Sequence, residues 1–209
     1  GKGYRQIDIN LGCPFPMIAG KHKGAGMLLY PAQVAEVLAP IAEYPEIQFS
    51  LKMRLGWENA SECMVLVELL NALRLSRIAL HARTGKQQYK GHPDLEAFQG
   101  FYELCQHPLY YNGGIESLSD IRQILIRFPL LKGVFIGRGL LSSPLLAKEF
   151  KGNETFLPEQ RMSIYFAFHE ELFSAYSQVL QGETQLLVKM KTLWEYFLPE
   201  TDRKLLKRI

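Results

Sequence analysis

The sequence has few of the residues that define several classes of protein. Only three of its 209 residues are cysteines, at positions 13, 63 and 105. Their wide spacing matches neither a disulfide framework nor a zinc site. An unpaired set is typical of a reducing compartment. We therefore expect no bound metal and a cytoplasmic location.

Long apolar runs and a strong excess of one charge are also missing. No stretch resembles a membrane span or a signal peptide, so we expect no membrane association. The 24 basic and 21 acidic residues give a formal charge of +3, which is too small to indicate a nucleic-acid partner by itself. Four basic residues do gather near the C-terminus, within 203–208. Such a run is typical of a solvated helix face, with phosphate contact as the alternative.

What the sequence does contain is an alternation of short apolar strands and amphipathic helices. We predict strands at 7–11, 48–55, 77–83, 109–112 and 133–136. Helices are predicted between them, at 31–45, 60–75, 94–103 and 118–128. The stretch 15–29 is rich in glycine and lysine and is expected to be a long loop. Strands that alternate with helices predict an α/β fold with a parallel sheet.

From about residue 157 the pattern becomes purely helical. Two long amphipathic helices are predicted at 159–180 and 183–198, separated by Gly182. We place a domain boundary within 151–158. This gives a β/α domain at 1–152 and a helical domain at 153–209.

Polar residues are concentrated where the predicted strands end. Parallel strands are normally covered on both faces and read as nearly pure apolar runs, so polar residues there need an explanation. The carboxyl ends of such strands are where β/α proteins build their sites. The residues are, in chain order, Asn10 and Cys13, Lys52 and Arg54, His81 and Arg83, Asn112, and Arg138.

Two glycine turns strengthen the case for a ligand. Gly113–Gly114 and Gly137–Gly139 follow the last two predicted strands, where backbone N–H groups of barrels commonly hold a phosphate. Buried cations are costly unless a polar or anionic group pairs with them. Each residue alone has a structural alternative: His81 as a satisfied core histidine, Cys13 as a small buried hydrophobe. Together they favour a phosphate-bearing cofactor or substrate.

Five segments, in their order and spacing, resemble the tRNA-dihydrouridine synthases over about residues 4–150. The helical tail is similar to the C-terminal domain of that family. The segments are Asp8–Pro14 (DINLGCP), Leu51–Gly56 (LKMRLG), Leu80–Thr84 with Gln88, Tyr89 and Gly91, Asn112–Ile115 (NGGI), and Gly133–Gly139 (GVFIGRG).

The resemblance implies a (β/α)8 TIM-type barrel that carries FMN, of which this chain has about five βα units, followed by a helical domain that helps to grip tRNA. It also implies a reaction, the flavin-dependent reduction of specific tRNA uridines to 5,6-dihydrouridine. NADPH reduces the flavin, hydride passes to C6 of the uracil, and Cys13 donates a proton to C5 from the opposite side. Cys13 must therefore be a protonated thiol when it acts.

The resemblance further implies roles for the polar strand ends. Lys52 would lie by the flavin N1–C2 carbonyl and His81 by the flavin or substrate. The flavin phosphate would be held by backbone around Asn112, Gly113, Gly114, Gly137 and Arg138. The residues expected to bind substrate are Asn10, Arg54, Arg83, Lys21 and Lys23.

The sequence departs from the family pattern at two points. Gly114 stands where the family usually has an acidic or amide residue, and the family has further βα units before Asp8. Five strands cannot close an eight-stranded barrel, so we expect a fragment or truncated relative with an open sheet edge at the first strand. Two alternatives stay open: an inactive remnant that binds RNA through the helical tail, and another phosphate-binding barrel enzyme, such as a Schiff-base aldolase using Lys52.

Overall fold

The computed structural model describes residues 3–196, which form two compact units. The first contains the residues up to 114 together with 121–135. The second contains 115–120 and the residues from 136 onward. The basic segment at 203–208 lies outside the described residues. The domain boundary expected between residues 152 and 153 stays a prediction.

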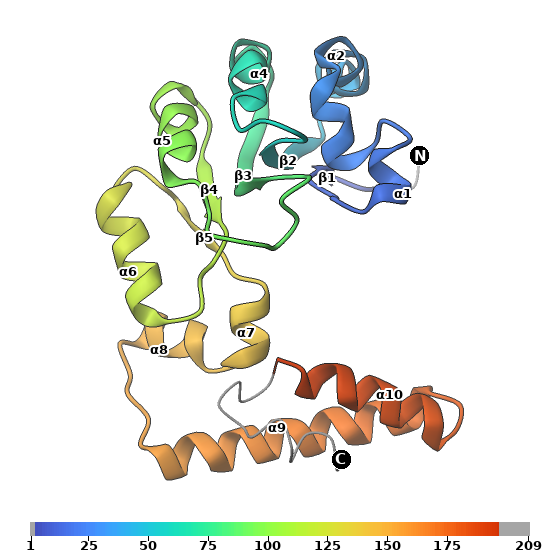
Figure 1. Ribbon diagram of the computed structural model, residues 1–209, viewed down its shortest axis with the longest axis vertical. Helices are drawn as coiled ribbons and strands as arrows, with labels where there is room; N and C mark the ends of the chain where they lie inside the picture. Colours follow the sequence, from blue (N-terminus) through green and yellow to red (C-terminus); the bar gives the residue numbers. More distant parts are fainter. Residues whose placement is uncertain (1–2, 197–209) are drawn as a thin grey trace. The chain divides into compact units, whose positions relative to one another are not determined.

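The first unit is built on a parallel five-stranded sheet whose strands follow one another in chain order (Figure 1). Parallel neighbours connected through helices are the repeating unit of a TIM-type barrel. The predicted α/β class and partial barrel are therefore confirmed. The strands are β1 (Gln6–Leu11), β2 (Gln48–Gly56), β3 (Leu75–Thr84), β4 (Leu109–Asn112) and β5 (Gly133–Phe135).

Helices α2, α4 and α5 lie along one side of this sheet (Figure 1). Most connecting helices begin near the predicted positions; α5, for example, starts after Asp94, whose side chain accepts a hydrogen bond from the Ala97 N–H. The helices up to the last strand are α1 (Pro16–Ala19), the 3₁₀ helix η1 (Gly24–Leu29), α2 (Pro31–Leu38), α3 (Pro40–Glu43), α4 (Glu62–Asn71), α5 (Leu95–Leu104) and α6 (Leu118–Arg127).

Alternation along the strands gives the sheet one apolar and one polar face. On β2, Leu51, Met53 and Leu55 are fully buried, and α4 contacts this strand. Lys52 and Arg54 point to the opposite face, as predicted from the period of two. The polar face is therefore the side of the sheet on which ligand-binding side chains are available.

The strand register brings the polar residues into rows. Arg54, His81 and Asn112 are Cα partners across β2, β3 and β4. Asn10 of β1 is the partner of Lys52 on β2. Side chains at paired positions of parallel strands point to the same face, so these five residues share the polar face near the carboxyl ends of the strands.

The expectation of a long loop at 15–29 is wrong. This stretch contains α1 and η1, because its glycines allow backbone segments to approach closely. A Cβ added to Gly26 would lie 2.3 Å from the carbonyl oxygen of Ala19. The glycine content that was read as flexibility is instead used for tight packing.

Two predicted helices have different bounds. The helix expected at 31–45 is divided into α2 and α3 by Pro40, whose ring removes a backbone donor and clashes with the preceding turn. The helix expected at 60–75 is shorter, because Leu75 already belongs to β3. The apolar run through these residues therefore spans a helix and the start of a buried strand.

The second unit is helical beyond β5. Its small core contains Leu145 and Tyr165, with four partly buried apolar side chains around them. Helices α9 and α10 lie side by side (Figure 1). The helices are α7 (Arg138–Ser142), α8 (Leu146–Gly152), α9 (Pro158–Val179) and α10 (Glu183–Trp194), so the two long helices were correctly predicted within the described residues.

The edge of the sheet at β1 is open, as expected, since within residues 3–196 this strand pairs with β2 alone. Most of β1 is exposed, and a hollow that includes Tyr4, Ile7, Tyr44 and Ile47 lies along it.

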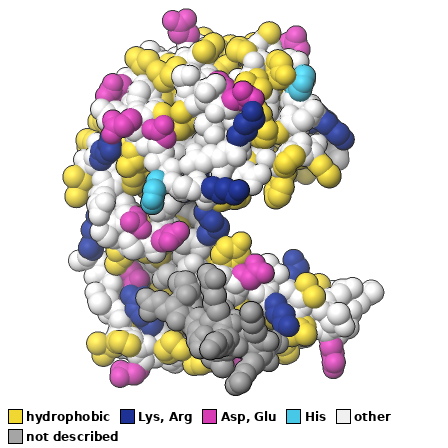
Figure 2. All heavy atoms as spheres, in the orientation of Figure 1, with side chains coloured by type: hydrophobic (Ala, Val, Ile, Leu, Met, Phe, Trp, Pro, Cys, Tyr) yellow, Lys and Arg dark blue, Asp and Glu magenta, His cyan; other side chains and the backbone are white. Residues whose placement is uncertain are grey.

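Acidic and basic side chains are interspersed on the face seen in Figure 2. No helix in the part of the chain that the structure describes is both long and apolar enough to cross a membrane.

Candidate active site

The turn after β1 holds Cys13 through hydrogen bonds to its backbone neighbours. The amide of Gly12 donates to Oδ1 of Asn10 at 2.9 Å, which is the Asx-turn geometry that an asparagine before a glycine favours. The carbonyl of Cys13 accepts from the amide of Ala25, at the start of η1, at 3.0 Å. The side chain of Cys13 remains partly exposed. A thiol on a fixed backbone with access to solvent is suited to proton transfer.

Lys52 lies beside this turn, through its register with Asn10. Burial lowers the pKa of Lys52, the charge of Arg54 lowers it further, and Asp8 opposes both effects. Within residues 3–196, its ammonium group forms no hydrogen bond or ion pair. A half-buried amine of this kind favours a negatively charged or electron-rich ligand, which would raise its pKa again.

Arg54 is surrounded by polar groups of the chain itself. Its Nε donates to the Gly12 carbonyl at 3.1 Å, and its Nη1 donates to the carbonyls of Thr84 and Gln88, both at 2.7 Å. The guanidinium also lies 5.3 Å from the ring centroid of Tyr89. Burial is the main cause that lowers the pKa of Arg54. The polar partners that a buried cation requires are therefore supplied by the chain itself; the predicted contact of Arg54 with substrate stays a prediction.

His81 and Arg83 are buried together on β3. Nη1 of Arg83 lies 3.2 Å from Nε2 of His81, and Nη2 of Arg83 donates to the Gly91 carbonyl at 2.9 Å. A guanidinium can only donate, so Nε2 of His81 accepts and the ring proton is assigned to Nδ1. In this arrangement His81 can donate a hydrogen bond through Nδ1.

The end of β4 forms a glycine turn against His81. Gly113 and Gly114 have φ values of +136° and +60°, which side-chain-bearing residues rarely adopt. A Cβ on Gly113 would lie 3.1 Å from Cδ2 of His81. The side chain of Asn112 donates to the carbonyl of Phe135 at 2.8 Å and so ties β4 to β5. Because these two residues have no Cβ, the side chains of His81 and Pro93 pack directly against the turn.

The remaining predicted residues lie elsewhere. Lys21 and Lys23 are exposed in the turn between α1 and η1, close in the chain to Cys13. Gly137 and Arg138 begin α7 in the second unit. Their proposed contact with a phosphate therefore stays a prediction.

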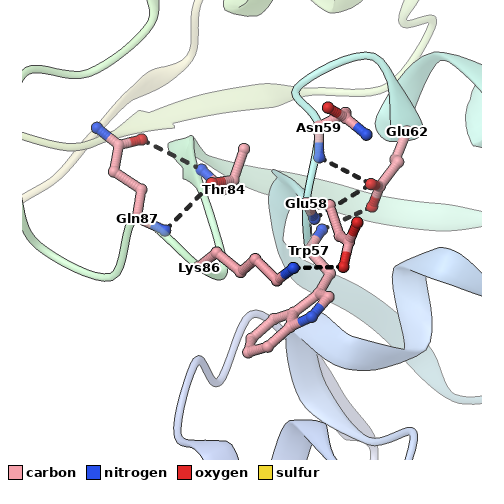
Figure 3. Close-up of polar contacts among 7 residues, drawn as sticks. All are labelled: Trp57, Glu58, Asn59, Glu62, Thr84, Lys86 and Gln87. Carbon is pink, nitrogen blue, oxygen red and sulfur yellow. Dashed lines mark hydrogen bonds and ion pairs between the residues drawn. The ribbon is translucent and has the colours of Figure 1, made fainter.

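Sequence reasoning missed Glu62, which organises the loop after β2. Its carboxylate accepts hydrogen bonds from the amides of Trp57, Glu58 and Asn59, at 2.7, 3.1 and 2.8 Å (Figure 3). The signal available in the sequence was an acidic residue at the start of a helix, where a carboxylate is favoured.

The loop after β2 is joined to the loop after β3. The amides of Gly85 and Lys86 donate to the carbonyls of Gly56 and Trp57 at 2.8 and 2.9 Å. Lys86 also forms an ion pair with Glu58 across the two loops (Figure 3). Sequence reasoning did not identify this pairing, since its partners lie about one βα unit apart in the chain. Together the joined loops form a rigid border to the polar strand ends.

Comparison with known proteins identifies the family. The model of the family "Dihydrouridine synthase (Dus)" matches residues 1–208, so the chain belongs to the dihydrouridine synthase family. A probable tRNA-dihydrouridine synthase of Aquifex aeolicus is 36% identical over 149 residues, covering 69% of this chain and 46% of that protein. A probable tRNA-dihydrouridine synthase of Rhizobium leguminosarum bv. phaseoli is 32% identical over 139 residues, covering 66% and 44%.

A third relative, tRNA-dihydrouridine synthase B of Vibrio vulnificus, is 27% identical over 161 residues, covering 75% of this chain and 50% of that protein. The chain thus spans about half the length of the curated relatives it matches.

Proposed function

We propose that this chain takes part in the flavin-dependent reduction of tRNA uridines to 5,6-dihydrouridine. The observation that carries the proposal is the fixed Asn10–Cys13 turn beside the half-buried Lys52, in a chain of the dihydrouridine synthase family. Family membership supports the reaction class, and the relatives named above are tRNA-dihydrouridine synthases. The details that follow are proposed for this chain's own residues.

FMN is the proposed cofactor, and the polar face offers groups that fit it. The ammonium of Lys52 suits the electron-rich edge of an isoalloxazine ring, because its lowered pKa rises again beside negative charge. The backbone N–H groups of the turn at Gly113 and Gly114 are proposed to hold the phosphate. His81 is proposed to lie beside the ring or the substrate. When bound, FMN reduced by NADPH supplies the hydride that reaches C6 of uracil.

Cys13 is the proposed proton donor. Its Sγ–H bond breaks as a C–H bond forms at C5 of the uracil, and the thiolate then regains a proton from solvent. The turn around it keeps the thiol in one place while the reaction proceeds. Asn10 accepts from Gly12 through Oδ1, which leaves its NH2 group to donate to the flavin or to uracil.

The proposed substrate is tRNA with its target base out of the stack. Extruding a base costs a few kcal/mol, so contacts to the surrounding phosphates are needed. Lys21 and Lys23 are exposed close to the Cys13 turn in the chain and are proposed to make such contacts, with Arg83 near the base. We also propose a phosphate role for Gly137 and Arg138. The three free cysteines support a reducing, cytoplasmic setting.

One observation favours a second reaction class. The lowered pKa of Lys52 is what a Schiff-base lysine requires. Borohydride trapping of a carbonyl substrate on Lys52, absent in Lys52→Met, would establish it. The fixed Cys13 turn has no part in that chemistry, so the reductase is the better-supported function.

The test is a flavin spectrum of the 209-residue chain with and without added FMN, beside Cys13→Ala and the matched Cys105→Ala. We expect bound flavin with altered absorbance in all three. In a single turnover on unmodified tRNA, Cys13→Ala should lose dihydrouridine formation, whereas Cys105→Ala should retain it. Failure to bind flavin at high FMN concentration contradicts a cofactor site in this chain, and RNA binding without flavin would favour a remnant without catalysis.

A further inference from the structure

Arg54 is a buried cation that the chain holds through three backbone carbonyls and the side chain of Tyr89. Its side chain is about as buried as any in the first unit, with 1% of the residue exposed. Within residues 3–196 it forms no ion pair with a carboxylate, and the three backbone carbonyls that accept from it are neutral. Burying a guanidinium without a counter-charge costs stability. The arrangement instead fixes the positions of the groups around Arg54, because its planar guanidinium sets the directions of several hydrogen bonds at once.

The first of these carbonyls belongs to the peptide bond that leads into Cys13. Gly12 donates its N–H to Asn10 and accepts from Arg54 through its carbonyl, so the residue before Cys13 is held on both sides. The Cys13 carbonyl is held in turn by the Ala25 amide. Of these contacts, only the one from Arg54 comes from a neighbouring strand of the sheet. It therefore sets the position of the thiol relative to β2.

The other two carbonyls belong to the last residue of β3 and to the loop that follows it. Thr84 and Gln88 both accept from Nη1, and Gln88 has a φ of +53°, a conformation that needs such support. The next residue, Tyr89, has its ring centroid 6.3 Å from that of His81. A single side chain thus connects the Cys13 turn with the loop that covers His81.

We propose that Arg54 is a positioning residue that holds the Cys13 thiol in register with the loop after β3. The inference rests on the proposed function in taking that thiol as the proton donor. Arg54 does so by fixing the Gly12–Cys13 peptide rather than by touching the substrate, since its Nε and Nη1 are occupied and the residue is covered. A displacement of about 1 Å at a reacting group costs about a hundredfold in rate.

The test measures alkylation of Cys13 by iodoacetamide, followed by peptide mass spectrometry over a pH range that brackets the thiol titration. The rate at full ionisation reports the access of the thiol, and the midpoint reports the charge around it. Arg54→Met removes both the fork and the charge, and Arg54→Lys removes only the fork. We expect the limiting rate to rise about tenfold in both variants, because each loses the hydrogen bond that holds the Gly12 carbonyl.

Two internal references separate local release from general unfolding. Burial raises the pKa of Cys63 to about 12, so this thiol should stay unreactive as long as the fold is intact. Cys105 should react at the same rate in all variants. Arg77→Met is the matched control, because Arg77 is an exposed arginine on the same face of the neighbouring strand β3. A limiting rate at Cys13 within about twofold of wild type in Arg54→Met would overturn the proposal, as would an equal rise at all three cysteines.

A single turnover with loaded flavin gives the functional consequence. Arg54→Met should retain flavin but form dihydrouridine about a hundredfold more slowly. A released Cys13 with undiminished turnover would also overturn the proposal. Because the alkylation assay contains neither flavin nor RNA, failure of the proposed reaction is seen separately, as dihydrouridine formation that survives in Cys13→Ala.

Discussion

Gly24 lies so close to Cys13 that a Cβ at position 24 would be 2.8 Å from both the Cβ and the carbonyl oxygen of Cys13. Gly24 also has a φ of +57°, in the left-handed region. The start of η1 therefore needs a glycine for two independent reasons, and the cysteine turn is held by the same contact.

Gly24→Ala should lower the free energy of unfolding by about 2–4 kcal/mol, from the left-handed backbone and from the clash with Cys13. Urea unfolding monitored by circular dichroism measures this change. Gly91→Ala is the matched control, because Gly91 has a φ of +62° but an added Cβ would meet only the Gln87 side chain at 3.5 Å. Gly91→Ala should lower the free energy of unfolding by about 1 kcal/mol. Equal losses in the two variants would show that the contact with Cys13 does not contribute to the effect of Gly24→Ala.

Glu62→Gln should loosen the loop after β2. The amide retains one acceptor oxygen and loses the charge that strengthens three backbone hydrogen bonds. We expect a loss of about 1–2 kcal/mol in stability, with faster hydrogen exchange at the amides of Trp57 and Asn59. Glu68→Gln, at an exposed position of the same helix, should change neither quantity. Unchanged exchange at Trp57 would contradict the anchoring role.

The buried carboxylate of Glu149 pairs with Arg161 between α8 and α9. Arg161→Met leaves that carboxylate buried without its partner. Because Arg161 is itself about a third exposed, we expect a loss of about 2–3 kcal/mol, below the range for a fully buried pair. Thermal unfolding of the variant provides the measurement.

The exposed pair Lys148–Glu154, at 3.8 Å, serves as the control in the same unit. Lys148→Met should change stability by less than about 1 kcal/mol, as is usual for surface pairs. Similar losses in Arg161→Met and Lys148→Met would refute the distinction between the buried and the exposed pair.

Lys52 should make stability depend on pH in the alkaline range. Burial lowers its pKa in the folded state below the ordinary value of 10.5, so the unfolded chain binds the proton more tightly. Its contribution therefore becomes more favourable as pH rises from the lowered pKa towards 10.5. Lys52→Met should be more stable than wild type at neutral pH, with a difference that shrinks towards that limit.

Urea unfolding at a series of pH values checks this, with exposed Lys132→Met as the control. The control should run parallel to wild type at every pH. A Lys52→Met curve that also runs parallel would show that burial imposes no penalty on the ammonium.

The period of two in β2 was enough to predict which side chains share a face. It placed Lys52 and Arg54 opposite Leu51 and Met53, as the structure shows. The same reasoning failed at 15–29, where glycine content indicated a loop. Whether a glycine marks flexibility or close packing depends on what lies against it, and Ala19 approaches Gly26 only once η1 has folded back.

The strand pattern, the helix starts and the family motifs were determined by the sequence alone, because each reflects the local period of the backbone or a short run of side chains. Only the tertiary structure decided the partners of those side chains. Arg54 donates hydrogen bonds to the carbonyls of Gly12 and Thr84, which lie 42 and 30 residues away. The local pattern of β2 predicts neither contact. A buried cation requires polar partners wherever it lies, but long-range packing determines whether those partners are a ligand or the protein's own carbonyls.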